Sequence, residues 1–360
     1  MRIALTLEQL WHRVPGGTGV AALGIARGLP TRPGLEVVGV SAAHRIPAPE
    51  PWRPPVEVRA LPLPRPALYE AWHRLRWPPV QRATGPADVV HATSIAVPPK
   101  SAPLVVTIHD LAFVAYPELF TPRGVTFFRR GLELARKDAD LVMCPSQATR
   151  RACEAAGFAA DRLRVIPLGV DVEAVTERDV QRVRERYGLG RDYVLWTGTV
   201  EPRKNLGGLL EAWKRVDTDA DLVLAGPAGW NEDLETLIAG MRRPTVLGFL
   251  ERAELHALYA GARLLVWPSL LEGFGFPVLE AMAHGTPVVT SAGTSTEEIC
   301  GDAGLVVDPR DPGAIAGAIS EVLEDASLAR AMGERGRRRA AAFTWKRTAE
   351  SLADAYGEIA

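Results

Sequence analysis

Short apolar runs recur along the whole chain and alternate with longer segments in which apolar residues return at helical spacing. In the first half these runs predict strands at Arg2–Leu7, Glu36–Val40, Val89–Ala92, Leu104–His109, Leu141–Cys144 and Leu163–Pro167. In the second half they predict strands at Tyr193–Trp196, Leu222–Ala225, Val246–Phe249, Leu264–Trp267, Val288–Thr290 and Leu305–Val307. Strands that alternate with helices form parallel sheets with helices on both faces. The pattern predicts an α/β chain of two doubly wound, Rossmann-like domains, whose strand carboxyl ends face a ligand-binding cleft.

The chain is long enough to build two hydrophobic cores. Its 360 residues exceed what one core usually holds. A charged helical pattern within Leu168–Gly190 lies between the last strand of the first half and the first strand of the second. We therefore expect one domain at residues 1–170 and another at 171–343. Proline is excluded from central strands and helix interiors, so the proline-rich segment Ile46–Pro66 predicts a surface excursion. An acceptor-binding loop is the alternative.

Composition places the chain among ordinary globular proteins, with 47% apolar and 24% charged residues. The three cysteines, Cys144, Cys153 and Cys300, form no CxxC pair, which argues against a disulfide framework or a zinc site. No apolar run reaches the roughly 18 residues of a transmembrane helix, and the start of the sequence lacks a signal-peptide pattern. The sequence predicts a cytoplasmic protein, at most peripherally attached to a membrane.

Charge is unevenly distributed although the net charge is only −1. Residues 1–170 carry 21 Lys and Arg against 13 Asp and Glu, a balance of +8, which leaves −9 for the remainder. A basic N-terminal half suggests an anionic acceptor or a membrane surface on that side. Scattered, solvated arginines that bind nothing are the alternative.

The stretch Leu264–Val289 carries the strongest chemical signal. It reads as a buried strand, a loop with Glu272, a helix opened by Pro277, and a second apolar strand. Glu280 then lies about one turn into the helix, and the free N–H groups at the helix start form a site for an anion. Two carboxylates that accept sugar or ribose hydroxyls, beside a phosphate site, indicate a nucleotide-sugar pocket. An ordinary βαβ turn with two solvated carboxylates is the alternative.

The full run around these two glutamates resembles a known signature. Glu272, Gly273, Phe274, Gly275, Phe276 and Glu280 resemble the EX7E motif of retaining glycosyltransferases of family 4, which have the GT-B fold. The resemblance implies that Glu280 binds ribose hydroxyls, that Glu272 binds a hydroxyl of the transferred sugar, and that the loop between them binds the donor. It also implies an acceptor-binding first domain, a nucleotide-sugar-binding second domain, and a C-terminal helix at 344–360 that packs back on the first.

Two basic residues follow the first strand of the second domain. Arg203 and Lys204 lie beyond a turn that contains Gly198. Arginine binds phosphate as a bidentate fork and lysine as a point charge, so the pair suits a diphosphate. A pair of surface cations alone is weak evidence, but the position matches the phosphate-binding pair of the family.

Residues of the first domain complete the candidate site. Gly16 and Gly17 follow the first strand, and the resemblance implies a loop whose backbone approaches the donor diphosphate. A glycine turn that leads into a helix is the alternative. His109 ends a strand within VTIHDL; the resemblance implies contact with the transferred sugar or the acceptor hydroxyl, whereas His91 is interpreted as structural. In the second domain, the resemblance places Phe249 near the nucleoside, and Trp230 is a further candidate there.

The expected activity is retaining transfer of a hexose to a hydroxyl of a glycan or glycolipid. We favour mannose from GDP-mannose, because VTIHDL and PELFTPR resemble bacterial mannosyltransferases that build cell-surface glycans. We expect no metal, because the Asp138–Asp140 and Asp217–Asp221 strings precede strands instead of following them. The alternatives are transfer from a UDP-hexose, epimerisation of a sugar nucleotide, and a non-catalytic sugar-nucleotide-binding subunit.

Overall fold

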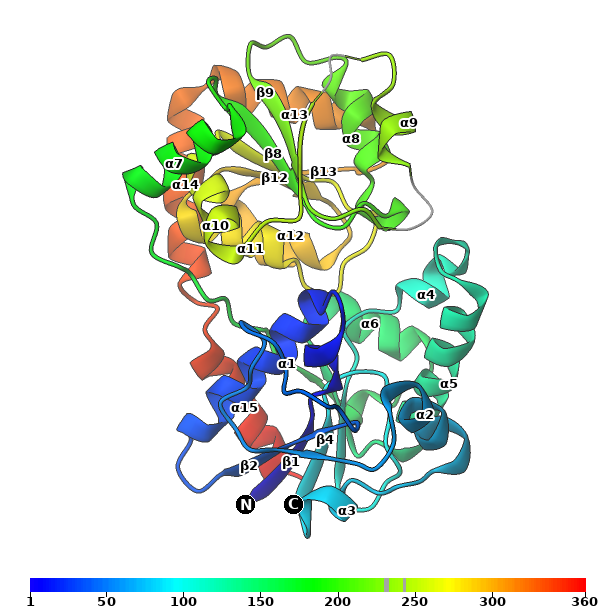
Figure 1. The fold of residues 1–360 in the computed structure, drawn as a ribbon. Helices are drawn as coiled ribbons and strands as arrows, with labels where there is room; N and C mark the ends of the chain where they lie inside the picture. Colours follow the sequence, from blue (N-terminus) through cyan, green and yellow to red (C-terminus); the bar gives the residue numbers. More distant parts are fainter. Residues whose placement is uncertain (230–232, 242–243) are drawn as a thin grey trace. The chain divides into compact units, whose positions relative to one another are not determined.

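The computed structural model describes residues 1–229, 233–241 and 244–360 (Figure 1). The chain divides into two compact units. Unit 1 comprises Met1–Gly169 together with Phe343–Ala360, and unit 2 comprises Val170–Ala342. Unit 1 is therefore built from two separate pieces of the chain, and each unit is described by itself below.

Unit 1 contains a seven-stranded parallel sheet in the order β3-β2-β1-β4-β5-β6-β7. The strands are β1 (Arg2–Thr6), β2 (Glu36–Ser41), β3 (Val58–Ala60), β4 (Val89–Ala92), β5 (Leu104–Thr107), β6 (Leu141–Cys144) and β7 (Leu163–Val165). The central strands β4, β5 and β6 are buried along their whole length, as parallel strands covered on both faces must be. The carboxyl ends of all seven strands therefore meet at one edge of this sheet.

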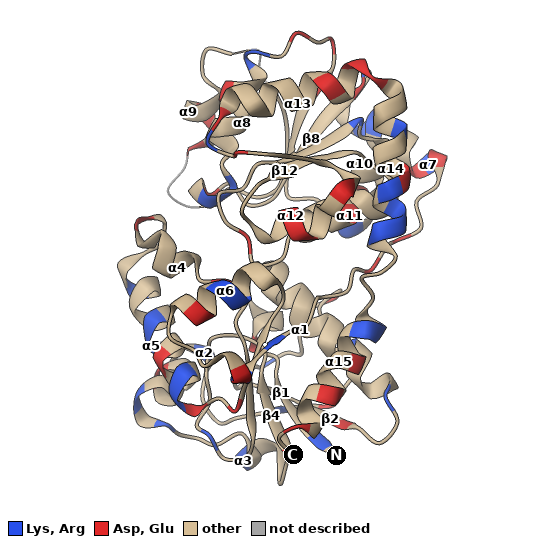
Figure 2. Cartoon of the chain, turned by 180° about the vertical axis from the view of Figure 1, so that it is seen from behind, with Lys and Arg blue, Asp and Glu red and all other residues tan. Residues whose placement is uncertain are grey.

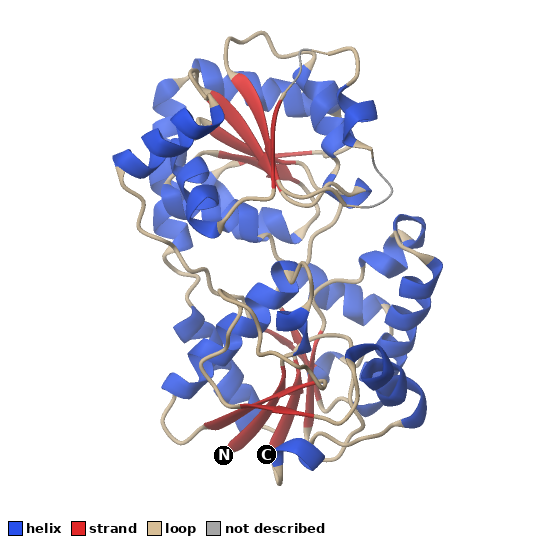
Figure 3. Ribbon diagram, viewed as in Figure 1, coloured by secondary structure: helices blue, strands red, loops and turns tan. Residues whose placement is uncertain are grey.

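Helices surround the sheet of unit 1 (Figure 3). They are α1 (Gly16–Gly28), α2 (Arg65–Glu70), α3 (Gln81–Thr84), α4 (Ala112–Ala115), α5 (Pro122–Asp138), α6 (Gln147–Ala155) and α15 (Trp345–Gly357). Helix α5 begins at Pro122, and Thr121 caps it by accepting from the Gly124 N–H at 3.1 Å.

The C-terminal helix α15 packs against α1 inside unit 1. A Cβ added at Gly24 of α1 would lie 2.2 Å from the Trp345 ring, so the two helices approach closely only because this position is glycine. At the far end of α15, the Tyr356 hydroxyl lies 2.6 Å from Nδ1 of the fully buried His91, whose Nε2 lies 2.7 Å from the Thr107 hydroxyl. Burial lowers the pKa of His91 to about 3, so this histidine is neutral and structural.

Unit 2 contains a six-stranded parallel sheet in the order β10-β9-β8-β11-β12-β13. The strands are β8 (Tyr193–Thr197), β9 (Asp221–Ala225), β10 (Thr245–Gly248), β11 (Leu264–Trp267), β12 (Val288–Ser291) and β13 (Leu305–Val307). The helices are α7 (Glu177–Tyr187), α8 (Leu206–Trp213), α9 (Leu234–Ile238), α10 (Arg252–Gly261), α11 (Phe276–His284), α12 (Ser295–Cys300), α13 (Pro312–Glu324) and α14 (Ala326–Ala340). From β8 the chain adds strands on one side of the sheet, and from β11 it adds them on the other side. Open α/β sheets bind ligands at such a switch point, beside the carboxyl ends of the strands.

The structure revises one local prediction and adds one strand. The glycines Gly16 and Gly17 form the first residues of α1 instead of a separate loop before it. The proline-rich segment contains the short strand β3, which the sequence pattern did not reveal; it is an edge strand, the position where neighbouring prolines are tolerated.

Charged residues are distributed over both units (Figure 2). The acidic string before β6 is engaged in ion pairs, Asp138 with Arg76 at 2.7 Å and Asp140 with Lys100 at 2.6 Å. Among the described residues, no helix combines the length and the apolar character that crossing a bilayer requires.

Candidate functional site

A cluster of charged side chains in unit 2 is built on the loop that follows β8. This loop turns sharply at Gly198, which has φ +138°, and a Cβ there would lie 2.8 Å from the Trp267 ring. The backbone conformation and the close ring together favour glycine at this position. The loop continues through Glu201, Arg203 and Lys204 at the carboxyl edge of the sheet.

Two cations and two carboxylates meet at this loop. Arg203 contacts Glu201 at 2.7 Å and Glu272 at 3.0 Å, and Lys204 contacts Glu272 at 2.5 Å. The Lys204 ammonium also lies 4.7 Å from the centre of the Trp267 ring, within range of a cation–π interaction. The sequence positions 203 and 272 are thus brought together by β8 and β11, which pair directly in the sheet.

Electrostatics fixes the charge state of this cluster. Burial by itself would raise the pKa of Glu272, but Lys204 and Arg203 outweigh it and hold the pKa at about 2. Burial and the neighbouring Arg203 lower the pKa of Lys204, whereas Glu272 and Glu201 oppose that shift. Glu272 is therefore ionised at neutral pH and can accept hydrogen bonds without donating a proton.

Polar side chains anchor the loops that carry the cluster. The Ser269 hydroxyl lies 2.9 Å from both the Arg203 carbonyl oxygen and Glu272 Oε1. Asn205, in the left-handed conformation at φ 54°, donates its amide to the carbonyl oxygens of Pro268 at 3.0 Å and Pro309 at 2.7 Å. These contacts connect the loops after β8, β11 and β13, so the cluster sits on a pre-organised frame.

The start of α11 lies directly after this loop. Gly275 adopts φ +116°, and a Cβ there would lie 2.7 Å from a methyl group of Thr296, so both backbone and space favour glycine. The Ser295 hydroxyl donates toward the carbonyl oxygens of Glu272, at 2.9 Å, and Phe274, at 2.8 Å. The amides at the start of α11 provide partial positive charge that can bind an anion.

Glu280 lies one turn into α11 and is half-buried. Burial raises its pKa to about 7, although Arg252 and a hydrogen bond from Tyr259 partly oppose this shift. The Tyr259 hydroxyl also lies 3.0 Å from the Thr197 hydroxyl at the end of β8. The pKa of Glu280 thus lies near neutral pH, whereas Glu272 is fully ionised there.

The other predicted donor-binding residues lie on loops of unit 2, except Phe276, which is the first residue of α11. Gly273 and Phe274 are buried, and the Phe274 and Phe276 rings pack edge to face with centroids 5.2 Å apart. Phe249 follows β10 and is 68% exposed. Trp230 lies outside the described residues.

The first-unit candidates lie at the carboxyl edge of the unit 1 sheet. His109 follows β5, and its Nε2 lies 3.0 Å from the Thr93 carbonyl oxygen. Burial lowers the pKa of His109, so the ring is neutral at neutral pH. Gly16, with φ +58°, and Gly17 begin α1 after β1.

Several contacting residues were missing from the sequence prediction. Glu201, Ser269 and Tyr259 contact predicted site residues, and Asn205 connects the loops that carry them. Glu201 and Asn205 carried a local signal, because they flank Arg203 and Lys204 in the sequence.

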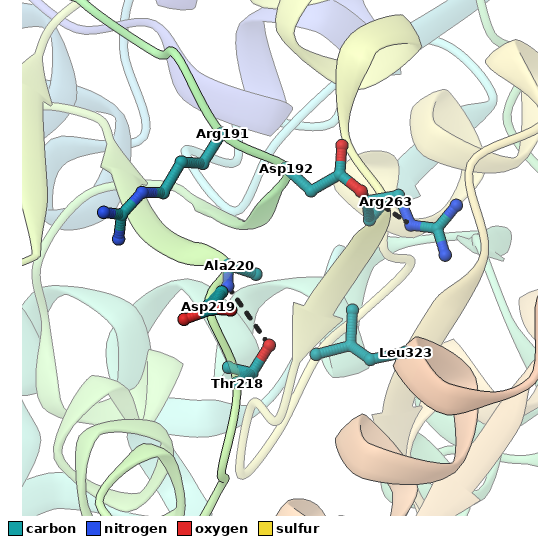
Figure 4. Close-up of a pocket in the computed structure, with 7 residues that line it drawn as sticks. All are labelled: Arg191, Asp192, Thr218, Asp219, Ala220, Arg263 and Leu323. Atoms are coloured by element: carbon teal, nitrogen blue, oxygen red, sulfur yellow. Dashed lines mark hydrogen bonds and ion pairs between the residues drawn. The ribbon is translucent and has the colours of Figure 1, made fainter.

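A separate hollow of about 520 Å³ opens at the opposite edge of the unit 2 sheet (Figure 4). It lies where β8, β9 and β11 begin, and Asp192 and Arg263 form an ion pair at 3.5 Å beside it. Asp219, from the second acidic string, lines the hollow. This acidic string is therefore remote from the strand carboxyl ends that carry Arg203 and Glu272.

Comparisons with known proteins assign the family. Residues 15–174 match the family described as Glycosyltransferase Family 4, and residues 191–325 match Glycosyl transferases group 1. The chain is 32% identical over 308 residues to O-antigen chain mannosyltransferase B of Escherichia coli, covering 81% of this chain and 80% of that protein. It is 35% identical over 281 residues to D-inositol 3-phosphate glycosyltransferase of Geodermatophilus obscurus, covering 71% of this chain and 61% of that protein.

Solved structures agree on the architecture. HepE of Anabaena, crystallised with UDP and glucose, superposes with a TM-score of 0.78 over 99% of this chain and all of that chain, at 22% identity. WaaG, a glycosyltransferase of lipopolysaccharide biosynthesis, gives a TM-score of 0.75 over 98% of this chain and 99% of that chain, at 21% identity. With two parallel α/β sheets of the GT-B kind and matches along both halves, the chain belongs to glycosyltransferase family 4.

Proposed function

We propose that this glycosyltransferase moves a mannosyl group from GDP-mannose to a hydroxyl of a glycan or glycolipid, with retention of anomeric configuration. The observation that carries the proposal is the arrangement in unit 2 of Arg203, Lys204 and Glu272 beside the start of α11, with Glu280 one turn further on. The choice of mannose is supported by relatives named as mannosyltransferases, including the E. coli protein and MMP alpha-(1->4)-mannosyltransferase of Mycolicibacterium hassiacum, at 29% identity over 76% of this chain and 71% of that protein.

In this proposal the nucleotide sugar binds unit 2. Its diphosphate binds the cations Arg203 and Lys204, which are paired with Glu201 and Glu272 in the structure. The amides at the start of α11 supply further donors to the phosphate oxygens. Glu280 accepts hydroxyl hydrogens of the ribose. The ionised Glu272 is then free to accept a hydroxyl of the hexose.

The chemistry follows from where charge develops. As the bond between the anomeric carbon and the phosphate oxygen breaks, negative charge grows on the leaving diphosphate, and fixed cations and amides stabilise it more in the transition state than in the ground state. We assign no metal to this step. A double displacement would require a carboxylate nucleophile below the sugar. Glu272 is already assigned to a hydroxyl, so we favour departure and attack on the same face, with a diphosphate oxygen taking the acceptor proton.

Unit 1 binds the acceptor in this proposal. The neutral His109 contacts the transferred hexose or the acceptor hydroxyl, and the backbone at Gly16 and Gly17 approaches the diphosphate. The basic surplus of unit 1 suits an acceptor that carries phosphate or lies at an anionic membrane surface.

Calorimetry tests the donor assignment. GDP, GDP-mannose, UDP and UDP-glucose are titrated in turn into the purified protein in buffer that contains EDTA. Selective, metal-independent binding of the two guanine nucleotides is the expected result. Binding of none of the four would contradict the assignment of the pocket.

A UDP-hexose is the second candidate donor, favoured by one observation. HepE, of the same architecture, was crystallised with UDP and glucose. Selective binding of UDP and UDP-glucose in the same titration would replace GDP-mannose by this donor. Conversion of the donor alone into an epimer, or donor binding without transfer to any acceptor, would instead point to the epimerase or the non-catalytic subunit.

A further inference from the structure

The segment that follows β1 carries two polar side chains that the proposed reaction does not use. Glu8 and Gln9 are both buried, 2% and 3% exposed, between the fully buried Leu7 and Leu10. Glu8 is satisfied, since Oε2 accepts from the Ala42 N–H at 2.7 Å and the carboxylate contacts His44 at 2.9 Å. Gln9 is different, because its Oε1 has no hydrogen-bond partner among the described residues.

The orientation of the Gln9 amide is fixed by its neighbours. The Thr93 hydroxyl donates its single hydrogen to the Thr6 carbonyl oxygen, so it can only accept from Gln9. Gln9 Nε2 therefore faces Thr93 Oγ1, at 3.0 Å, and Oε1 points elsewhere as an unused acceptor. A buried acceptor without a partner is unfavourable, and a hydrogen-bond donor on a ligand would remove that cost.

The same threonine also orients His109. The Thr93 carbonyl oxygen cannot donate, so His109 Nε2 carries the hydrogen in their 3.0 Å contact. Because burial keeps this ring neutral, Nδ1 bears a lone pair and is a hydrogen-bond acceptor. Thr93 thus presents two uncharged acceptors, Gln9 Oε1 and His109 Nδ1, at the carboxyl ends of β1, β4 and β5.

We propose that Gln9 is a specificity-determining residue that, together with His109 and oriented by Thr93, binds a hydroxyl group of a sugar. Two neutral acceptors suit hydroxyl donors and disfavour an anion, which would find no hydrogen to accept. The inference rests on the proposed function for its ligand, and the sugar is either the acceptor or the transferred hexose. Gln9 Oε1 is shielded from solvent whereas His109 is half-buried, so the ligand hydroxyl approaches from the His109 side.

The test compares Gln9→Met, which keeps the length of the side chain and removes the amide, with Gln81→Met as a matched control elsewhere in unit 1. Titration of GDP and UDP first establishes that nucleotide binding by unit 2 is unchanged. We expect Gln9→Met to lower transfer roughly 10- to 100-fold at subsaturating acceptor, and Gln81→Met to stay within twofold of wild type. Thr93→Ser, which keeps the hydroxyl, should retain transfer, whereas Thr93→Val should resemble Gln9→Met.

Hydrolysis of the donor without acceptor distinguishes the two sources of the hydroxyl. If Gln9 binds a hydroxyl of the acceptor, Gln9→Met should lower transfer and leave donor hydrolysis unchanged. If Gln9 binds a hydroxyl of the transferred hexose, Gln9→Met should lower both rates equally. Unaltered transfer per folded molecule in Gln9→Met, with only a lower melting temperature, would make Gln9 a structural residue and overturn the proposal.

A second measurement is independent of turnover. Methyl α-D-mannoside and methyl α-D-glucoside are added to wild type and to both methionine variants, and the melting temperature is followed. We expect at least one glycoside to stabilise wild type and Gln81→Met but not Gln9→Met. Stabilisation of all three alike would reject Gln9 as a sugar-binding residue even if the donor assignment is correct. If a glycoside stabilises the protein only when Gln9 is present, the inference stands even where the nucleotide titration contradicts the donor assignment.

Discussion

Two glutamates eight positions apart acquire opposite protonation behaviour because of what surrounds them. Glu272 shares Arg203 and Lys204, which keep it ionised down to a pKa of about 2. Burial raises the pKa of Glu280 to about 7, because Arg252 and the Tyr259 hydroxyl offset it only in part. The spacing in the sequence therefore identifies the two glutamates, whereas their pKa values depend on contacts that only the folded structure shows.

Removing one phosphate-binding cation should abolish most turnover while the fold survives. We expect Arg203→Ala to reduce the rate of transfer about 100- to 1000-fold, the effect of losing one donor to a developing negative charge. Lys214→Ala is the matched control, since Lys214 is a half-exposed cation of the same unit whose partner is Glu211. Steady-state rates, with circular dichroism of both variants, provide the check. Near wild-type turnover of Arg203→Ala would remove Arg203 from the mechanism.

The raised pKa of Glu280 predicts a pH-dependent stability. A carboxyl whose folded pKa exceeds its ordinary value of 4.5 stabilises the fold below pH 4.5, and this contribution is lost as the pH rises to about 7. Glu280→Gln should therefore match wild type near pH 4.5 but exceed it by roughly 2 kcal/mol at pH 8, allowing for solvent screening at a half-buried group. Urea unfolding of both proteins at the two pH values measures the difference. An equal difference at both pH values would contradict the shift.

At the scale of elements, α1 and α15 form a pair whose contact depends on one glycine. Gly24 lies against the Trp345 ring, and the ring leaves no room for a methyl group. The packing joins two segments more than 300 positions apart in sequence, as the Arg32–Glu350 ion pair at 3.2 Å also does. Unit 1 therefore depends on the C-terminal helix for part of its core.

Two glycine-to-alanine changes should have opposite effects, because one glycine lies in this contact and the other lies in open space. Gly24→Ala should destabilise unit 1 by about 1 to 3 kcal/mol, because the added methyl group forces the Trp345 ring aside. Gly317→Ala, on an exposed position of α13 with nothing within 4 Å, should instead stabilise unit 2 by up to about 1 kcal/mol through helix propensity. Thermal unfolding of the two variants beside wild type gives the comparison. A neutral or stabilising Gly24→Ala would show that the two helices do not pack this tightly.

The sequence predicted most elements because parallel strands buried on both faces are continuous apolar runs. It missed β3, since proline and charged residues dominate its surroundings and a short edge strand needs little hydrophobicity. Within the site, the glutamates and the Arg203-Lys204 pair were found through their local pattern. The contacts of Asn205 with Pro268 and Pro309 were not, because nothing in the chain indicates which loops meet at the end of a sheet.

At the scale of the whole molecule, the two units carry opposite charge. Unit 1 holds 23 Lys and Arg against 16 Asp and Glu, and unit 2 holds 19 against 27. In unit 1, exposed basic residues such as Arg129 and Arg130 lie on α5. We therefore expect an anionic surface to attract unit 1 more strongly than unit 2.

Binding to lipid vesicles should therefore depend on α5 and on salt. We expect the protein to sediment with vesicles containing about one-third phosphatidylglycerol at low ionic strength and to be released by salt, because exposed charges are screened within about a Debye length. Charge reversal at Arg129 and Arg130 should reduce sedimentation, whereas Arg338→Glu on the exposed face of α14 in unit 2 should not. Equal sedimentation of both variants, or binding that ignores salt, would exclude electrostatic attachment through α5.

The discontinuous composition of unit 1 also affects how the chain is made. The ribosome delivers Met1–Gly169 first, then all of unit 2, and only afterwards the segment Phe343–Ala360 that completes the first unit. At about 5–20 residues per second, the nascent first unit waits on the order of 10 to 40 s for its last helix. During that interval its α1 surface and His91 lack their partners Trp345 and Tyr356. The unit synthesised first is therefore finished last, and it is the one most exposed to chaperones and to misassembly during translation.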